Sequence, residues 1–326
     1  SKRYTTQILT LVMKHPLNLM KSMNNSPFTI ENTVFVDCPT SYEGCVVVPD
    51  GITDIGDKAL MFCNKVNEVI LPDTLEGIGM CAFHGCNFKE ISIPTKCLYI
   101  SDYAFLCCQR LKEIDLPEGM LVVGEATFCG CRELERVKLP NSLRIIREEV
   151  FAGCEKLKSV TIPPNIEKID AMAFAECKSL KEIVIPDCCR HLCYGVFKEC
   201  TSLERVVIGD GVSNEQGGEN CFLNCTSLKY AKLSSNMVCV ISGFFEGCSS
   251  LKEVIIPEGI KWIDCEAFKD CTSLESITLP HSMVEIYEYA FEGCKNLHYI
   301  KMPAHTVINS HAFVGCPETI TIERYL

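Results

Sequence analysis

The sequence predicts a solenoid, a long fold in which one short unit is stacked on copies of itself. One observation is that a large apolar residue, in eleven units of twelve Phe, stands three positions before a cysteine. The other is the regular spacing of these cysteines. Eight of the eleven intervals are 23 residues and the others are 22, 22 and 25, and a fixed period of this size indicates a repeat architecture. The twelve ladder cysteines are Cys63, Cys86, Cys108, Cys131, Cys154, Cys177, Cys200, Cys225, Cys248, Cys271, Cys294 and Cys316.

The repeated unit reads L-x-x-I-x-x-x-A-F-x-x-C-x-x-L-x-x-I-x-L-P, and residues 166–186 match it at nearly every position. A unit of 23 residues presents one apolar edge and cannot enclose a core alone. Only neighbours of the same kind can cover that edge. We therefore expect a continuous stack and no second domain within it.

The end of each unit alternates between apolar and polar residues, as a half-buried strand does. Ile114 and Leu116 would point inward, whereas Glu113 and Asp115 would face solvent. This pattern predicts one parallel strand in each 22–25-residue repeat, and twelve strands at about 4.8 Å would form a sheet on the order of 55 Å long. The proline that follows most strands lacks an N–H and ends the ladder.

The A-F-x-x-C step is expected to form a short helical or 3-10 turn opposite the strand. Phe would fill the core and the ladder cysteine would be a small buried apolar group with a free thiol. Cys188, Cys189, His191 and Cys193 form a cluster with some likeness to a metal site. Because Cys189 occupies a core position of the repeat, we expect no zinc there.

The pattern resembles a known family, the BspA-like leucine-rich repeats, which are also described as the treponemal type. The resemblance covers about residues 46 to 320 and rests on the A-F-x-G/E-C-x-x-L-x-x-I-x-L-P runs. One such run contains Ala82, Phe83, Gly85, Cys86, Ile91, Ile93 and Pro94, and another contains Ala290, Phe291, Gly293, Cys294, Leu297 and Ile300.

The resemblance implies a right-handed leucine-rich repeat solenoid, rich in β structure and of the α/β superhelix class. It also implies a protein that is displayed on the cell surface or secreted by host-associated bacteria and some protists, and that acts in adhesion. The partner implied is a protein, such as a host extracellular matrix or cell-surface protein. Function in such a fold depends on exposed residues that vary, not on the repeated core.

The chain divides into residues 1–45, which lie outside the repeats, and the solenoid of about twelve repeats at 46–326. The first part contains apolar residues that could form one or two short amphipathic helices around Pro16. We expect it to cap the first core layer of the solenoid. A docking helix, or the remnant of a larger upstream region, is the alternative. The apolar residues are Ile8, Leu9, Leu11, Val12, Leu17, Leu19 and Met20.

The composition argues against some functions but does not decide in which cellular compartment the protein works. The net charge of −11 and the lack of a long basic run argue against binding to nucleic acid or an anionic membrane. No apolar stretch approaches the roughly 20 residues needed to span a bilayer. The 24 cysteines suit a reducing cytoplasm or an anaerobic niche better than an oxidising environment, and a cytoplasmic location is the alternative to the cell surface.

Motifs of the common enzyme classes do not occur in the sequence. It has no G-x-S-x-G, no G-x-x-x-x-G-K-S/T, no H-E-x-x-H and no C-x-x-C. We therefore predict a protein that is not an enzyme and that has no catalytic residue, cofactor or metal ion.

The seventh repeat is irregular between Gly209 and Asn220, where two residues are added and the usual L-x-x-I pair is reduced to Val212. Gly217 and Gly218 permit positive φ, so we expect a loop that bulges from the solenoid. A plain insertion is one reading, and a contact loop is the other, since insertions often lie at binding sites. The oxygen-bearing residues lack the order of an EF-hand. These candidate loop residues are Asp210, Glu215, Glu219 and Asn220.

The outward residues of the strands are the candidates for contact with a protein partner. In the C-terminal half they include apolar and aromatic side chains, which are typical of protein-binding patches. The alternative is that β-branched residues only favour strand structure. The candidates are Val184, Val207, Tyr230, Ile255 and Tyr299. The leading hypothesis is a non-enzymatic, adhesin-like protein-binding solenoid, and the alternative is an intracellular interaction scaffold.

Overall fold

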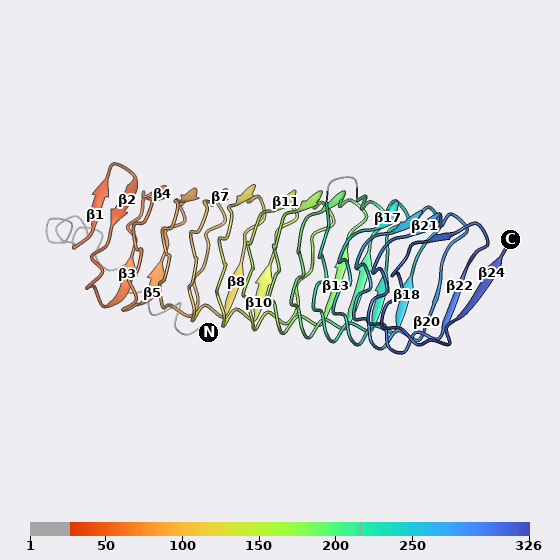
Figure 1. Ribbon diagram of the computed structural model, residues 1–326. Helices are drawn as coiled ribbons and strands as arrows, with labels where there is room; N and C mark the ends of the chain where they lie inside the picture. The colour runs from red at the N-terminus through yellow and green to blue at the C-terminus, as the bar shows by residue number, and fades with distance from the viewer. Residues whose placement is uncertain (1–26, 215–216) are drawn as a thin grey trace.

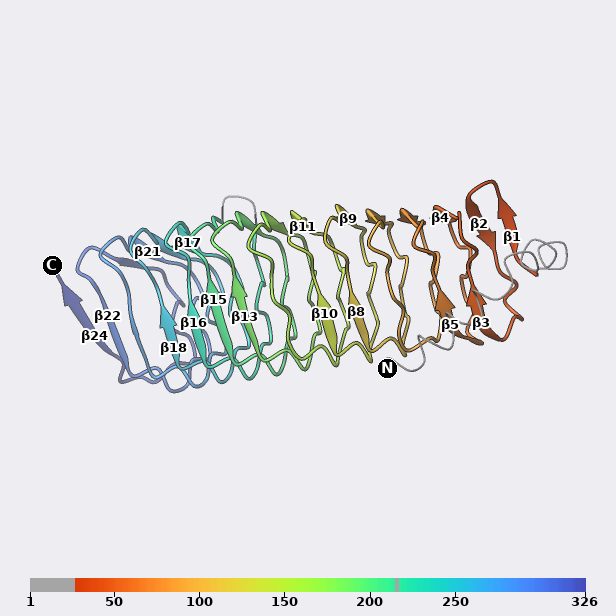
Figure 2. The same cartoon turned by 180° about the vertical axis from the view of Figure 1, so that it is seen from behind.

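The computed structural model describes residues 27–214 and 217–326. They form a parallel β-solenoid of about 13 turns. In Figure 1 the coils follow one another in chain order along one axis, and the view from behind in Figure 2 shows the same stack. The predicted solenoid fold is therefore confirmed.

Most coils carry a long strand where the I-x-L-P segment was expected to form one, and two coils have only an isolated bridge there, at Glu90 and at Ser159. The long strands pair in parallel with the next coil, for example Ile183 with Val206. We call their outward side the long-strand face. The long strands are β3 (Gly44–Val47), β5 (Val66–Ile70), β8 (Glu113–Asp115), β10 (Arg136–Lys138), β13 (Glu182–Ile185), β15 (Arg205–Ile208), β16 (Tyr230–Lys232), β18 (Glu253–Ile255), β20 (Ser276–Thr278), β22 (Tyr299–Pro303) and β24 (Thr321–Tyr325).

A second series of strands, most of them two residues long, arises from the L-x-x-I step and lies along the upper edge in Figure 1. We call its outward side the short-strand face. This series consists of β1 (Thr29–Glu31), β2 (Val34–Asp37), β4 (Asp54–Ile55), β6 (Gly77–Ile78), β7 (Tyr99–Ile100), β9 (Val122–Val123), β11 (Ile145–Ile146), β12 (Lys168–Ile169), β14 (His191–Leu192), β17 (Cys239–Val240), β19 (Trp262–Ile263), β21 (Glu285–Ile286) and β23 (Val307–Ile308).

The expectation of one strand per repeat was therefore incomplete, because most coils have two. The short strands could not be predicted from the sequence because a strand of two residues is too short to show an alternation of apolar and polar residues. They form only because the next coil supplies hydrogen-bond partners for their backbone groups.

The expected helical or 3-10 turn was wrong, since no helix occurs in residues 27–214 and 217–326. In its place is a run of turns with two left-handed residues per coil, five positions and one position before the ladder cysteine. In one coil these are Glu149 (φ 54°) and Gly153 (φ 70°). Helical φ cannot continue through such residues. The Phe151 N–H consequently donates to Ala173 O of the next coil (2.8 Å).

The core consists of ladders of equivalent side chains. Phenylalanine rings of successive coils are stacked, as in Phe128 and Phe151, whose centroids lie 5.6 Å apart with an angle of 5° between the planes. The ladder cysteines lie beside them, and eleven of the twelve are buried, while Cys316 in the last coil is half-buried. All 24 cysteines lie in the described residues and none is in a disulfide.

The N-terminal end of the described solenoid is covered by an antiparallel hairpin of β1 and β2. The ring of Phe28 contacts those of Phe35 and Tyr42 there, and Phe35 is fully buried. Residues 1–26 of the predicted cap lie outside the described residues. The division of the chain at residue 46 remains a prediction.

Candidate protein-binding surface

Strands β13, β15, β16 and β18 form one sheet that carries four of the five candidate contact residues. The register places Val184 beside Val207, which lies beside Lys232, and Lys232 lies beside Ile255. Tyr230 stands in the neighbouring row of the same sheet, between Arg205 and Glu253. The four candidates therefore lie on one continuous surface.

Exposure differs among these four side chains. Val184 is 60% exposed and Ile255 is 41% exposed, whereas Val207 and Tyr230 are half-buried. The Arg205 guanidinium lies 4.1 Å from the centre of the Tyr230 ring, a cation-π contact that holds the ring against the sheet. Lys232 interrupts the apolar row, so the patch is apolar with a cation at its centre.

Tyr299 lies on the other side of a break in the sheet, because β18 and β20 are not paired in one sheet. Its ring belongs to the sheet of β20, β22 and β24, and its hydroxyl donates to Glu323. This hydrogen bond raises the pKa of Tyr299. The structure therefore places Tyr299 on the same long-strand face as the other four candidates but apart from their sheet.

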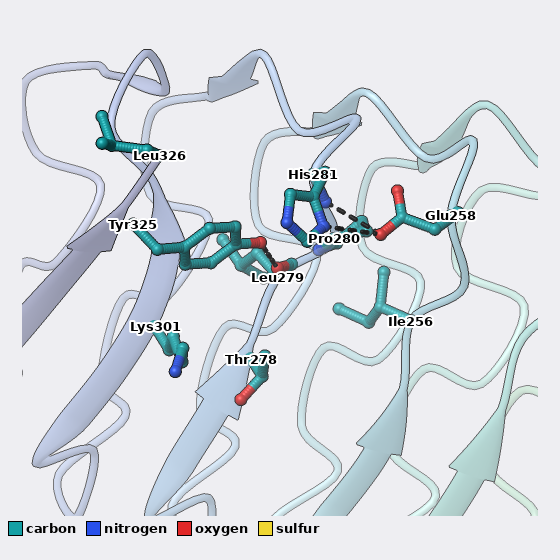
Figure 3. Close-up of a pocket in the computed structure, with 9 residues that line it drawn as sticks. All are labelled: Ile256, Glu258, Thr278, Leu279, Pro280, His281, Lys301, Tyr325 and Leu326. Atoms are coloured by element: carbon teal, nitrogen blue, oxygen red, sulfur yellow. Dashed lines mark hydrogen bonds and ion pairs between the residues drawn. The ribbon is translucent and has the colours of Figure 1, made fainter.

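An open hollow of about 550 Å³ connects these two parts of the face. It starts at Ile256, next to Ile255, and extends to Lys301 and Tyr325, as Figure 3 shows. Its lining is Ile256, Glu258, Thr278, Leu279, Pro280, His281, Lys301, Tyr325 and Leu326. Sequence reasoning missed this hollow because its walls come from four coils, and only the register brings them together.

Hydrogen bonds fix the polar residues of the hollow. The Tyr325 hydroxyl donates to Leu279 O (2.5 Å), and burial raises the pKa of that phenol. The backbone N–H of His281 donates to Glu258 (3.0 Å) and lowers the pKa of this carboxyl group. Lys301 Nζ lies 2.9 Å from Glu323, which raises the pKa of the lysine. The hollow thus has an apolar base, and charged side chains held by hydrogen bonds surround it. A hollow of this kind suits an apolar side chain of a partner.

The N-terminal half of the long-strand face has a different character. A smaller hollow of about 250 Å³ is lined by Glu90, Glu113, Asp115 and Arg136, among others. Arg136 is the cation here and bonds to both Glu113 (2.9 Å) and Asp115 (2.5 Å). The middle of the face is therefore charged, and apolar side chains occur at both ends of it, as Val47 of β3 is exposed beside Ile70 of β5.

The candidate loop residues are not gathered into a site. The exposed Asp210 accepts the backbone N–H of Ser235 (3.0 Å), and this bond lowers the pKa of Asp210. The Asn220 side-chain amide donates to the Tyr194 hydroxyl (3.4 Å), and the Glu219 carbonyl accepts the Gly195 N–H (3.0 Å). Glu215 lies outside the described residues.

The loop approaches the short-strand side of the solenoid. The side chain of Asn214 donates to Cys239 O of β17 (2.6 Å) and accepts the N–H of Val238 (3.1 Å). Gly218 is close to Leu192 O of β14. The loop and the long-strand candidates therefore do not form one contact surface.

The cysteine cluster near residue 190 is dispersed. Cys188 is exposed, Cys189 is buried and Cys193 is half-buried, with its sulfur 3.7 Å from Asp170 Oδ1. Within residues 27–214 and 217–326, no three His, Cys, Asp or Glu side chains form a group that could hold a metal ion. In the same ranges, no helix is long and apolar enough to cross a membrane.

Comparison with known proteins decides the family. The model of the BspA type leucine-rich repeat region matches residues 28–131, 121–237 and 215–324. The chain belongs to the BspA-type leucine-rich repeat family. This confirms the resemblance stated from the sequence.

The chain is also similar to solved structures, among them proteins described as leucine-rich repeat proteins. A leucine-rich repeat protein from Bacteroides ovatus is 30% identical, with a TM-score of 0.70 over 92% of this chain and 91% of that chain. The pneumococcal vaccine antigen PcpA is 16% identical, with a TM-score of 0.51 over 89% and 85%. A leucine rich cell surface protein from Faecalibacterium prausnitzii is 23% identical, with a TM-score of 0.48 over 92% and 93%. No curated protein matches the chain.

Proposed function

We propose that this BspA-type solenoid is a non-enzymatic module that binds a protein partner through the C-terminal half of its long-strand face. The observation that carries the proposal is the patch of Val184, Val207, Tyr230 and Ile255 in one sheet, of which Val184 and Ile255 are exposed, with the hollow beside it. Exposed apolar and aromatic side chains on a rigid sheet offer contact area at little cost in entropy.

The biological setting that we propose is adhesion, with the chain displayed on the cell surface or secreted. The partner would be a host extracellular matrix or cell-surface protein. Membership of the BspA-type family supports this setting. Tyr299 and the hollow would extend the contact beyond the sheet of β13 to β18.

An intracellular interaction scaffold is the second candidate. The observation that favours it is the set of 24 cysteines, none of them in a disulfide and one of them, Cys188, exposed. Such a number of thiols is compatible with a reducing compartment.

A pull-down from host extracellular matrix and, in parallel, from the lysate of the producing cell tests both candidates. The bait would be the wild-type chain and a variant with Tyr230, Val207 and Ile255 replaced by Ala, Asp and Asp. A matched control would carry Ser92→Ala, Lys138→Ala and Thr161→Ala, which are exposed positions in the N-terminal half of the same face.

Capture of an identified matrix protein by the wild type and the control, but not by the variant, would support the adhesin. Capture with the same dependence from the lysate alone would support the scaffold. Equal capture by all three chains would contradict the long-strand face as the binding surface.

A further inference from the structure

A second group of exposed apolar residues lies on the short-strand face, in three successive coils. The Leu121 N–H donates to Leu98 O (2.7 Å), and Tyr99 lies beside Val122 in the register of β7 and β9. Leu121 is 62% exposed. We call the group the short-strand apolar row. It consists of Leu98, Tyr99, Leu121, Val122 and Ile145.

Tyr99 carries the row across one further coil. Its ring lies over Gly77, where an added Cβ would stand 2.0 Å from Tyr99 Cζ. The ring can occupy this place because residue 77 is a glycine and has no side chain. The Tyr99 hydroxyl donates to Asp54 in the coil beyond, and this bond raises the pKa of Tyr99 to about 12. The aromatic ring is thus fixed as part of the surface.

Carboxylates border the row. Glu76 is exposed and close enough to Tyr99 to contribute to the rise of its pKa. Glu125 and Glu148 follow the row residues in their coils, and Glu148 is exposed. Two cations lie at the far end, Arg144 next to Ile145 in the chain and Lys168 beside Ile145 in the register, and each is paired with a carboxylate. The surroundings of the row are mainly acidic and would favour an apolar segment that carries cations.

The first 26 residues of the chain have this composition. Lys2, Arg3, Lys14 and Lys21 are their only charged side chains, and Ile8, Leu9, Leu11 and Val12 are apolar. Removing these four cations from the 31 of the whole chain leaves 27 against 42 carboxylates, a net charge of −15 for residues 27–326. The two parts of the chain are therefore complementary in charge.

The segment also joins the solenoid at the right sheet. It precedes β1, and the strand order of that sheet is β1-β2-β4-β6-β7-β9. Five steps of about 4.8 Å place β9 about 24 Å from β1. The connection from residue 20 to Thr29 could span up to about 30 Å when extended, so the row is within reach.

We propose that residues 8–20 of this chain pack their apolar side chains on the short-strand apolar row, with their cations toward the acidic border. The first coil is already covered by the hairpin and by Phe28, Phe35 and Tyr42. A second layer is therefore not needed there. The occupant is this chain itself, so the inference is independent of the partner on the long-strand face.

Photo-crosslinking of the full chain tests this proposal. The photoreactive residue p-benzoylphenylalanine would replace Leu121, and in a matched control it would replace Val284, which holds the equivalent position seven coils later and is also exposed. Mixing unlabelled and ¹⁵N-labelled chains separates links within one molecule from links between two.

We expect links from position 121 to residues 8–20 of the same molecule, in about tenfold higher yield than from position 284. Links between two molecules would show that a second copy occupies the row and would overturn the proposal. Equal yields from the two positions, or no link to residues 8–20, would also overturn it.

A pair of charge-matched variants separates apolar packing from charge attraction alone. Leu11→Asp with Val12→Asp should lower the yield from position 121 about tenfold. Thr5→Asp with Thr6→Asp adds the same charge without removing apolar surface and should lower it far less. Equal losses in the two variants would contradict packing by the apolar side chains. The melting temperature of each variant would show that the solenoid is intact.

Discussion

At the scale of the residue, each ladder cysteine donates a hydrogen bond from its thiol to a backbone carbonyl of the coil before it. The Cys177 thiol donates to Phe151 O (3.3 Å), a carbonyl that also accepts the Cys154 N–H (3.1 Å). Burial raises the pKa of Cys177 well above its ordinary value, so the thiol keeps its proton and remains a donor. The cysteine ladder therefore stabilises the stack by packing and by hydrogen bonds.

The repeat period was enough to predict which cysteines and phenylalanines lie in the core, because a residue that recurs at a fixed position in every coil must meet its own copies. The bond from thiol to carbonyl was not predictable. It joins residues 26 positions apart, across the boundary of two coils, and depends on the register between them.

Replacing Cys177 with Asp should destabilise the protein by about 3–5 kcal/mol, since a carboxylate would be buried without a partner. Cys177→Ser keeps a small donor near Phe151 O and should cost much less. Thermal unfolding of the two variants measures the difference. An unchanged melting temperature in Cys177→Asp would show that the position is not in the core.

At the scale of the element, the turns and the strands were predictable to different degrees. The long strands followed from alternation. The turns did not, because A-F-x-x-C is compatible with a helical turn and the left-handed φ is held by varied residues. Among them are Glu149, Met172 and Glu199. Only the glycine before some ladder cysteines, such as Gly153, indicated a left-handed position.

Glycine should therefore be preferred at left-handed positions that now hold another residue. Glu199 has a φ of 60°, and Glu199→Gly should raise the free energy of unfolding by about 0.5–1 kcal/mol, after the entropy cost of glycine is subtracted. The matched control is Glu167→Gly, an exposed glutamate with an equally weak ion pair that is not left-handed, and it should lower stability by a similar amount. Denaturant unfolding gives both values, and a loss of stability in Glu199→Gly would contradict the turn geometry.

The patch on β13 to β18 makes its own prediction at this scale. Tyr230→Ala removes a ring that lies under Arg205 on the long-strand face and should weaken binding of a captured partner about tenfold or more. The melting temperature should stay nearly constant, because the ring lies outside the core. Wild-type affinity in this variant would exclude Tyr230 from the contact.

At the scale of the whole molecule, the sequence specified a solenoid but not what its faces look like. Both hollows of the long-strand face, and the short-strand apolar row, arise from side chains of several coils that only the register brings side by side. The candidate contact residues Val184, Val207, Tyr230 and Ile255 were placed on one surface because strand alternation is local. The sequence did not predict that the loop lies apart from that surface. This separation depends on the side of the coil from which the insertion projects.

Buried thiols make the stability of the whole solenoid sensitive to alkali. Burial raises the pKa of Cys108, Cys131, Cys154 and Cys177 well above the ordinary value near 9 that the unfolded chain would show. Their contribution to stability is complete below pH 9 and is lost as the pH rises above it, because only the unfolded chain ionises. Each such thiol removes up to about 1.4 kcal/mol per pH unit. Unfolding monitored from pH 7 to 10.5 should show a steep loss above pH 9, and a flat profile would contradict burial of protonated thiols.

The most direct test of the proposed function is the affinity of one identified, purified partner for three chains. These are the wild type, the variant with Tyr230→Ala, Val207→Asp and Ile255→Asp, and the control with Ser92→Ala, Lys138→Ala and Thr161→Ala. We predict that the variant loses at least about a hundredfold in affinity with its melting temperature retained, and that the control binds like the wild type. Equal affinity of all three chains would place the binding surface elsewhere on the solenoid.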